Sequence, residues 1–219
     1  MSATLRLRFN GGELECAPRH LIVAGYTGRD EAAARVHIEE LAAIGVPEPP
    51  SVPAFYRLDP GLLTAEPVIA VAGGNTSGEV EPVLIRHRDR HYLGVGSDHT
   101  DRDIERTGIA AAKAACPKPL GGEVVELPDG EAAWDAIRVE SSVDGNRYQS
   151  GTLAELRTPG DLLGRLADAV GDLDGDVVVF AGTLPLLGGV FAPGRRWQLS
   201  LTVGATTLTC EYETKWRTS

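Results

Sequence analysis

The chain has 219 residues, of which 42% are hydrophobic, and 31 acidic against 21 basic side chains give a formal net charge of −10 at pH 7. This size allows one substantial hydrophobic core, and the acidic balance argues against a nucleic-acid partner. No stretch approaches the roughly 18 apolar residues of a membrane span, and no signal-peptide core is present, so we expect no membrane partner. Three widely spaced cysteines, Cys16, Cys116 and Cys210, are typical of reduced thiols and indicate the cytoplasm.

Alternating polar and apolar residues open the chain. Thr4–Phe9 and Glu13–Cys16 are predicted strands, and the Asn-Gly-Gly between them is typical of a hairpin turn. We therefore predict an N-terminal hairpin over residues 1–19 and a single compact domain over residues 20–219. That domain starts with a short apolar strand, His20–Gly25.

Residues Asp30–Ile44 have helical spacing and stop at Gly45, which predicts a helix. His37 and Glu40 are three positions apart in it, so their side chains share one face. A carboxylate that orients an imidazole and raises its basicity creates a general base. A surface pair has the same spacing, and both interpretations stay open.

Prolines dominate the next stretch, between Pro47 and Pro53, and exclude a helix or a central strand. The predicted loop ends at Phe55-Tyr56-Arg57. Loops of this kind often carry function. Arg57 would clamp a carboxylate if it faced a pocket, or it is an ordinary surface arginine.

Carboxylates gather around a predicted hairpin of the strands Glu81–Ile85 and His91–Gly96. Glu79 and Glu81 point the same way because alternate side chains of a strand share a face. Asp98 follows the second strand, so the turn brings all three carboxylates to one rim. Oxygen ligands with room for water are typical of a hard cation, Mg²⁺ or Mn²⁺. The alternative is a solvated acidic strand face.

Two lysines follow this cluster. Asp101–Ala115 is a predicted helix with acidic residues in its first turn and Thr100 as its N-cap. Lys113 lies at its end, and Lys118 lies in the proline-flanked loop beyond. A lysine beside such carboxylates can stabilise an enolate or a substrate carboxylate, but a lysine at a helix C-terminus is also favourable for the helix alone.

The second half of the chain is predicted to be mostly strand. The predicted elements are a strand Trp134–Ser142 that turns back through Arg147–Gln149, a helix Leu162–Val170, a buried strand Asp176–Phe180 that runs into Thr183, and final strands Trp197–Val203 and Thr206–Tyr212. There is no βαβ rhythm and no internal repeat. We therefore predict a β-rich α+β domain, a mostly antiparallel roll with helices on its edges.

Taken in chain order, these motifs resemble the fumarylacetoacetate hydrolase superfamily from about Leu21 to Cys210. The matching stretches are His37-Ile38-Glu39-Glu40, the proline loop with Phe55-Tyr56-Arg57, Glu79-Val80-Glu81, Ser97 to Asp103, Lys113 with Pro119-Leu120-Gly121, Asp144 to Gln149, Gly175 to Thr183, and Pro193-Gly194. No single motif carries the resemblance; their order does. Residues 20–219 would then be a catalytic domain of that type.

The resemblance implies a metal site, Mg²⁺ or Mn²⁺, on Glu79, Glu81 and Asp98. It implies a His37–Glu40 dyad that activates water or moves a proton, with Lys113 acting at the reaction centre. Arg57, Lys118, Gln149 and Thr183 would bind the carboxylate and oxo groups of the substrate, and Lys118 is the alternative to Lys113 as the active-site lysine.

Such a site implies a metal-dependent hydrolase that cleaves a C–C bond in a small 2-oxo or acylpyruvate-type acid. The rival reactions are decarboxylation, dehydration and isomerisation of such acids, and the rival class is a non-catalytic protein that binds a small acid. The resemblance also implies a homodimer. The chain departs from the superfamily pattern at Arg57, where lysine is usual, and at Ser97, where asparagine is usual. It also departs in the short segment between Glu81 and Asp98, so it is expected to be a divergent branch.

Overall fold

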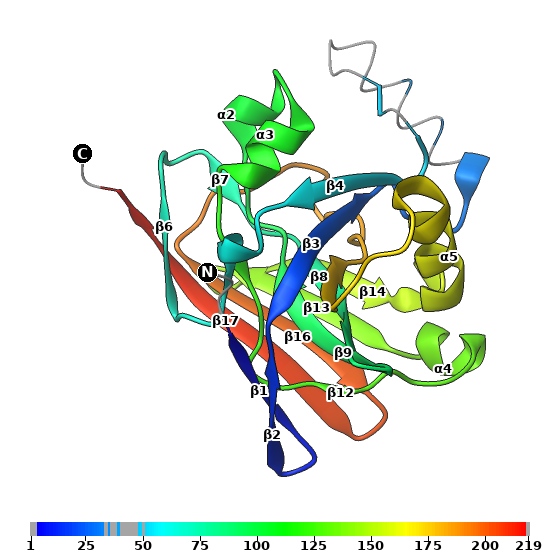
Figure 1. Ribbon diagram of the computed structural model, residues 1–219. Helices are drawn as coiled ribbons and strands as arrows, with labels where there is room; N and C mark the ends of the chain where they lie inside the picture. The colour runs from blue at the N-terminus through cyan, green and yellow to red at the C-terminus, as the bar shows by residue number, and fades with distance from the viewer. Residues whose placement is uncertain (1–3, 33–34, 36–38, 40–47, 50, 218–219) are drawn as a thin grey trace.

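Two sheets form the body of the protein in this computed structural model, which describes residues 4–32, 35, 39, 48–49 and 51–217 (Figure 1). The larger sheet has six strands in the order β12-β9-β8-β15-β3-β4. Their bounds are Val125–Glu126 (β12), Arg90–Ser97 (β9), Val80–His87 (β8), Asp176–Phe180 (β15), Pro18–Gly25 (β3) and Ala54–Leu58 (β4). The predicted carboxylate hairpin is confirmed as β8–β9.

The second sheet has five strands in the order β14-β13-β16-β17-β6. Their bounds are Asn146–Thr152 (β14), Arg138–Val143 (β13), Arg196–Val203 (β16), Thr206–Trp216 (β17) and Val68–Val71 (β6). In both large sheets the described strands pair antiparallel, except for β15 with β3 and β17 with β6. The mostly antiparallel, β-rich α+β fold is therefore confirmed.

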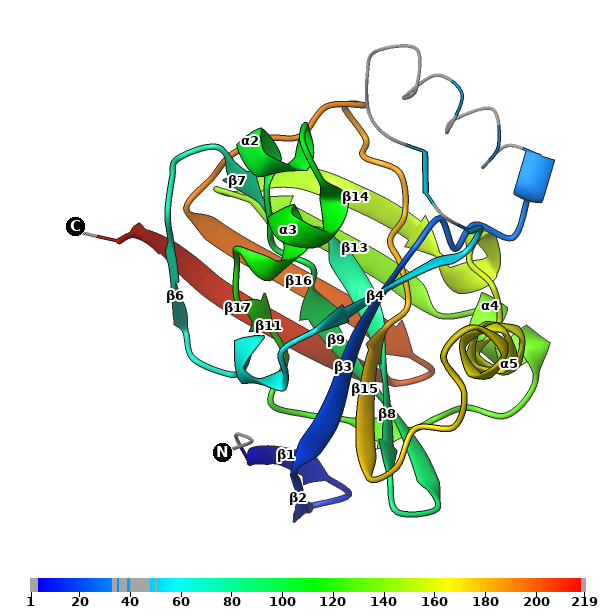
Figure 2. The ribbon, with the colours of Figure 1, turned by 45° about the horizontal axis from the view of Figure 1, so that its top comes forward.

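Short elements connect and cover these sheets. Three two-stranded pairs are β1 (Leu5–Phe9) with β2 (Gly12–Cys16), β7 (Thr76–Ser77) with β10 (Thr100–Asp101), and β5 (Leu63–Thr64) with β11 (Lys118–Pro119). The helices are α2 (Arg102–Glu105), α3 (Ile109–Ala114), α4 (Glu131–Asp135) and α5 (Pro159–Val170), with 3₁₀ turns η1 (Pro60–Leu62) and η2 (Leu153–Glu155). Figure 2 shows α2 and α3 on one side of the molecule and α4 and α5 on another.

Apolar side chains cover both faces of the six-stranded sheet. One core cluster lies between the two sheets and includes Leu84, Val179 and Trp197. A second lies on the outer face, where Leu7 of the N-terminal hairpin packs in one cluster with Ile85. A strand covered on both faces is buried at successive positions, which explains the unbroken buried run from Val80 to Ile85 in β8, where Glu81 is the one charged residue.

Two predicted elements differ in the structure. The helix expected over Asp101–Ala115 is divided into α2 and α3, with Asp101 instead of Thr100 as the N-cap and the backbone extended at Gly108. Glycine favours such a break because its backbone loses more entropy in a helix than that of other residues. The strand expected from Trp134 begins only at Arg138, because Trp134 lies in α4 and its side chain is buried in the core between the sheets.

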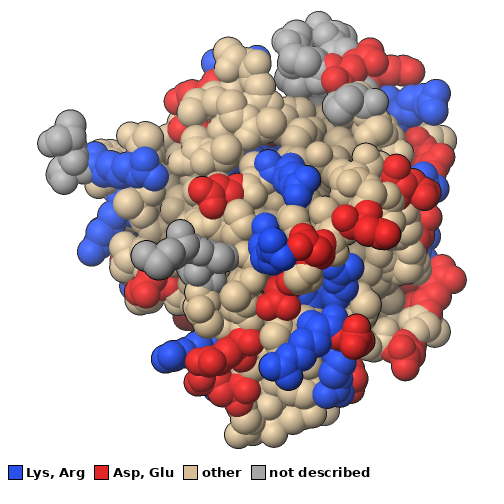
Figure 3. Space-filling model, in the orientation of Figure 1, with Lys and Arg blue, Asp and Glu red and all other residues tan. Residues whose placement is uncertain are grey.

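Charged side chains are dispersed over the face seen in Figure 3, where blue and red atoms lie interspersed. No helix in the described ranges is long and apolar enough to cross a membrane. Most of the helix predicted over Asp30–Ile44, including His37 and Glu40, lies outside the described residues.

Candidate active site

A cavity of about 730 Å³ opens where β3 and β15 end and β8 begins. The residues that line it come from the loop after β3, from β4, from the start of β8, from α2 and α3, from η2, and from the loop after β15. They are Ala24 to Asp30, Tyr56, Glu79, Glu81, Glu105, Ile109, Lys113, Ala154 to Leu156, Gly182 to Leu186, and Gly189. A second cavity, of about 110 Å³, lies between α5 and the six-stranded sheet and is mainly apolar.

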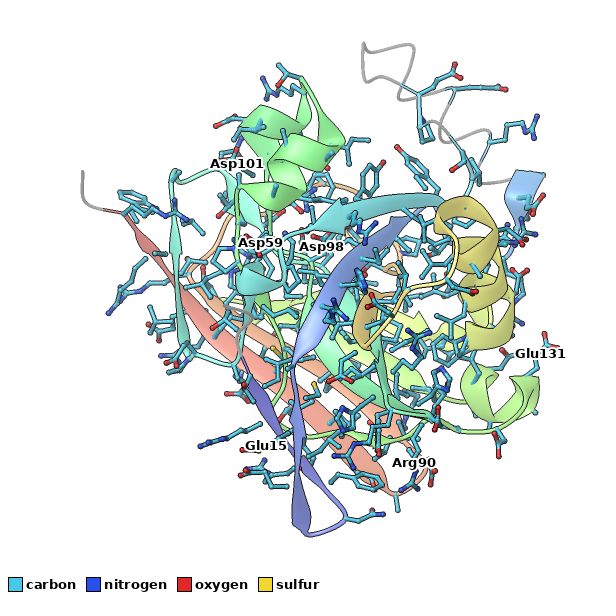
Figure 4. The ribbon with its side chains drawn as sticks, in the orientation of Figure 1. Glu15, Asp59, Arg90, Asp98, Asp101 and Glu131 are labelled. Atoms are coloured by element: carbon cyan, nitrogen blue, oxygen red, sulfur yellow. The ribbon has the colours of Figure 1, made fainter. Side chains whose placement is uncertain are left out.

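The β8–β9 hairpin places Glu79 and Glu81 in the wall of the larger cavity and buries Asp98 behind that wall. Asp98 follows β9, and its backbone N–H donates to the carbonyl oxygen of Glu79 over 3.1 Å. Its fully buried carboxylate pairs with Lys113 and, over 3.1 Å, with Lys118. Burial by itself would raise the pKa of Asp98, but these two lysines hold it well below its ordinary value. Figure 4 shows Asp98 inside the protein, whereas Glu15, Arg90 and Glu131 lie at its periphery.

Glu81 is buried and accepts a hydrogen bond of 2.9 Å from the backbone N–H of Gly182. Burial, together with the negative charge of Asp98, raises its pKa well above the ordinary value. The backbone of Gly182 has φ +95°, and a Cβ there would lie 1.7 Å from Oγ1 of Thr27. Only glycine therefore fits at the position that holds Glu81.

Glu79 is held by Arg102, which lies at the start of α2. Nη2 of Arg102 donates to Glu79 over 2.9 Å, Nη1 donates to both carboxylate oxygens of Glu105, and Nε donates to Ser77. The ring of Phe191 covers the guanidinium, with its centroid 3.5 Å from Cζ. This network fixes two acidic side chains in the cavity wall.

The two candidate lysines have different surroundings. Lys118 has no exposed side-chain surface, and its ammonium donates to the carbonyl oxygens of His99 and Lys113, each over 2.5 Å, besides pairing with Asp98. All three of its protons are therefore used within the protein. Lys113 lines the cavity instead. Burial lowers its pKa, but Asp98, Glu79 and Glu81 together raise it above the ordinary value, so its ammonium is stabilised by three carboxylates.

Gln149 and Thr183 connect two strands beneath the cavity. The amide oxygen of Gln149 accepts from the backbone N–H of Val80, and its nitrogen donates to Oγ1 of Thr183 and to the carbonyl oxygen of Leu184, each over 2.7 Å. Gln149 is fully buried and does not appear in the described lining, whereas Thr183 does. The structure thus places Gln149 behind the wall and Thr183 in it.

Arg57 lies apart from these residues. It is exposed on β4, and its guanidinium donates to Nδ1 of His20 over 2.8 Å. The neighbouring Tyr56 faces the other way and lines the cavity. His37 and Glu40, the predicted dyad, lie outside the described residues, so their position relative to the cavity stays a prediction.

Sequence reasoning missed several residues of this site. Arg102 was noted only as part of a motif, and no spacing rule links it to Glu79, which precedes it by 23 positions. His99 is buried and bonded to the hydroxyls of Tyr212 and Thr76, and burial lowers its pKa to about 3, so it is neutral. The hydroxyl of Tyr56 is buried with no partner in the described part of the chain, and burial raises its pKa to about 12.

The donor chemistry of Glu79, Glu81 and Asp98 fits a hard divalent cation, since all three are carboxylates and their negative charges already affect one another. Among the described residues, however, no three acidic, histidine or cysteine side chains are arranged to hold a metal ion. The protein's own cations pair with Asp98 and Glu79. A metal would therefore compete with Lys113 for Asp98 and with Arg102 for Glu79.

Solved structures of the fumarylacetoacetate hydrolase family share this fold. A fumarylpyruvate hydrolase from Pseudomonas aeruginosa, solved in complex with Mn²⁺ and pyruvate, superposes with a TM-score of 0.64 and 17% identity over 99% of this chain and 98% of that one. A 5-carboxymethyl-2-hydroxymuconate delta-isomerase from Mycobacterium smegmatis superposes with a TM-score of 0.65 and 18% identity over 94% of this chain and 82% of that one.

A comparison with curated protein sequences found no match. A family model described as a protein of unknown function, DUF2848, matches residues 24–213, which include the described cavity lining and most of both large sheets. The chain therefore belongs to the DUF2848 family, and its fold is the one shared by solved structures of the fumarylacetoacetate hydrolase family.

Proposed function

We propose that this protein is a divalent-metal-dependent hydrolase that cleaves a C–C bond in a small 2-oxo or acylpyruvate-type acid. The observation that carries the proposal is that Lys113 lines one cavity with Glu79 and Glu81 and pairs with Asp98, which is buried behind the wall. Carboxylates and a lysine so placed suit a substrate that has both an anionic group and a carbonyl oxygen on which negative charge develops.

Glu79, Glu81 and Asp98 would hold Mg²⁺ or Mn²⁺. When bound, such an ion polarises the oxo group and favours build-up of negative charge on its oxygen. The Mn²⁺ and pyruvate in the fumarylpyruvate hydrolase structure support this assignment by similarity of fold. The negative charges around Glu81 support it too, because a divalent cation would neutralise carboxylates that now repel one another.

The protein's own groups would bind and orient the substrate. Lys113 is the better candidate for the active-site lysine, since its side chain lines the cavity while the three protons of Lys118 are used elsewhere. Lys118 would act on the substrate only through Asp98. Thr183 lies in the wall, and Gln149 holds it there through a hydrogen bond of 2.7 Å.

The His37–Glu40 pair is proposed as the base that activates water. Arg57 is proposed as a substrate-binding residue, which it could be only if β4 or its neighbours rearrange. Hydrolysis is proposed ahead of isomerisation on the resemblance alone, since the structural neighbours include both reaction types. A homodimer is proposed on the same resemblance. Static light scattering tests it, and a monomer at working concentration would refute it.

A non-catalytic acid-binding protein is the second candidate. The observation that favours it is that Asp98 and Glu79 already pair with Lys113, Lys118 and Arg102, so the site is neutralised without a metal. Such a protein would bind small acids through Lys113 with no dependence on Mn²⁺.

Mn²⁺ binding and turnover together separate these functions. We expect Glu81→Gln to weaken Mn²⁺ binding, measured by electron paramagnetic resonance, at least tenfold, while Glu140→Gln, an exposed residue of β13, leaves it unchanged. His37→Ala should abolish release of pyruvate from an acylpyruvate but keep Mn²⁺ affinity. Equal Mn²⁺ binding by Glu81→Gln and the unaltered protein would refute the metal site, and acid binding without Mn²⁺ or turnover would favour the second candidate.

A further inference from the structure

The cavity has two chemically different ends. At one end α3 and the start of β8 supply Lys113, Glu79 and Glu81. At the other, the loop after β3 joins the segment around η2: Gly28 pairs with Leu156, and the N–H of Arg29 donates to the carbonyl oxygen of Glu155 over 2.8 Å. Arg29 pairs with Glu131 and Asp135 of α4, and Figures 1 and 2 show α4 on a different side of the molecule from α3.

Apolar side chains form the wall between the two ends. They are Ala154, Leu156, Leu184, Pro185 and Leu186. Leu184 reaches the distant end itself, because a Cβ at Gly151 would lie 2.9 Å from both Leu184 Cδ1 and an oxygen of Glu155. The volume of about 730 Å³ is within the range of roughly 300–1,000 Å³ typical of drug-sized ligand sites, far more than a three-carbon acid fills.

No free cation lies at the distant end in the described part of the chain. The cationic side chains in the described lining are Lys113 and Arg29. Every N–H group of the Arg29 guanidinium is already used: Nε and Nη2 donate to the carbonyl oxygen of Leu156, Nη1 to Glu131 and Asp135, and Nη2 also to Asp135 over 2.6 Å. Arg29 therefore has no donor left for a ligand.

An acidic side chain, Glu155, lies at this end of the described lining, so a second carboxylate on the substrate would meet a like charge. Between residues 31 and 53 the sequence contains one Lys or Arg, Arg35, which is exposed and not part of the described lining. Among the described lining residues, a charged tail at this end would thus find no cation with a free donor.

We infer that the substrate is a monocarboxylic 2-oxo acid whose acyl tail is apolar and uncharged, and that Leu184 and Leu186 select for that tail. The inference rests on the proposed function, because Lys113 and the carboxylate cluster are taken to bind the oxo-acid head. It excludes dicarboxylic oxo acids as the preferred substrates of this chain.

Isothermal titration calorimetry with Mn²⁺ present tests the tail. The ligands are pyruvate, 2-oxobutyrate, 2-oxovalerate and 2-oxohexanoate, with 2-oxoglutarate as the dianionic counterpart of 2-oxovalerate. We expect the dissociation constant to fall by up to about fourfold per added methylene, the factor for burial of one CH₂. We expect 2-oxoglutarate to bind about tenfold more weakly than 2-oxovalerate, since its second carboxylate has no partner.

A matched pair of variants checks where the tail lies. Leu186→Arg puts a cation into the lining and should reverse the preference in favour of 2-oxoglutarate, while Leu187→Arg, on a neighbouring residue that is 57% exposed, should leave it unchanged. The inference would be overturned if the dissociation constants from pyruvate to 2-oxohexanoate were equal, or if the unaltered protein bound 2-oxoglutarate and 2-oxovalerate equally. In either case, binding of pyruvate would still support the proposed function. Binding of none of these acids would refute both.

Discussion

Replacing Lys118 by methionine tests whether Lys118 stabilises the fold, whereas Lys113 binds the substrate. The ammonium of Lys118 is fully buried and contacts Asp98 and the carbonyl oxygens of His99 and Lys113. Methionine keeps much of the volume but leaves a buried carboxylate with one cation instead of two. Breaking a buried pair from one side costs about 3–5 kcal/mol. For a chain of this length each kcal/mol lowers Tm by about 2–4 °C, so we expect a fall of roughly 6–20 °C.

Differential scanning calorimetry and urea titration measure that loss. Lys215→Met, at an exposed position of β17, is the matched control and should change Tm little. Lys113→Met should cost less stability, because Lys113 lines the cavity and its loss leaves no buried carbonyl oxygen unpaired, whereas Lys118 also holds the carbonyls of His99 and Lys113; it should nevertheless abolish binding of 2-oxo acids. The reasoning fails if Lys118→Met costs under about 1 kcal/mol, or if the two lysine variants lose stability and binding in equal measure.

Three further predictions follow from the same structure. Gly182→Ala should destabilise the protein by more than about 1 kcal/mol, since the residue has φ +95° and its Cβ would overlap Thr27; a stability within error of the unaltered protein would contradict this. Phe191→Ala should cost about 0.5–2 kcal/mol through loss of the contact with Arg102, measured by urea unfolding against Val190→Ala, and equal losses would argue against the stacking. A hydrogen bond from Arg157 lowers the pKa of Asp161, so this carboxylate stabilises the fold above its unfolded pKa near 3.8 and loses that effect as pH falls through its lower folded value. Asp161→Asn should therefore flatten the acid side of the stability curve, and an unchanged acid limb would refute the assignment.

The local pattern was enough to place the carboxylate hairpin. The apolar runs of β8 and β9 and the polar turn between them are properties of neighbouring residues, and the observed register pairs Val80 with Ser97 as a hairpin requires. The strand Asp176–Phe180 was predicted with its observed bounds because a short run of β-branched residues bounded by turns has few alternatives. The order of such segments was also enough to indicate the fold, because proteins with the same topology have their strands, helices and motifs in the same order along the chain.

Side-chain direction was decided only in three dimensions. Lys113 and Lys118 are equivalent in sequence, and burial of one under the backbone of His99 separates them. Arg57 and Tyr56 are adjacent in a strand, so one faces the cavity and the other must face away, but sequence alone does not tell which. Trp134 entered a helix because its large ring is buried between sheets formed by distant segments. Sequence thus determined elements and their order, while contacts between residues far apart in the chain decided which side chains meet at the cavity.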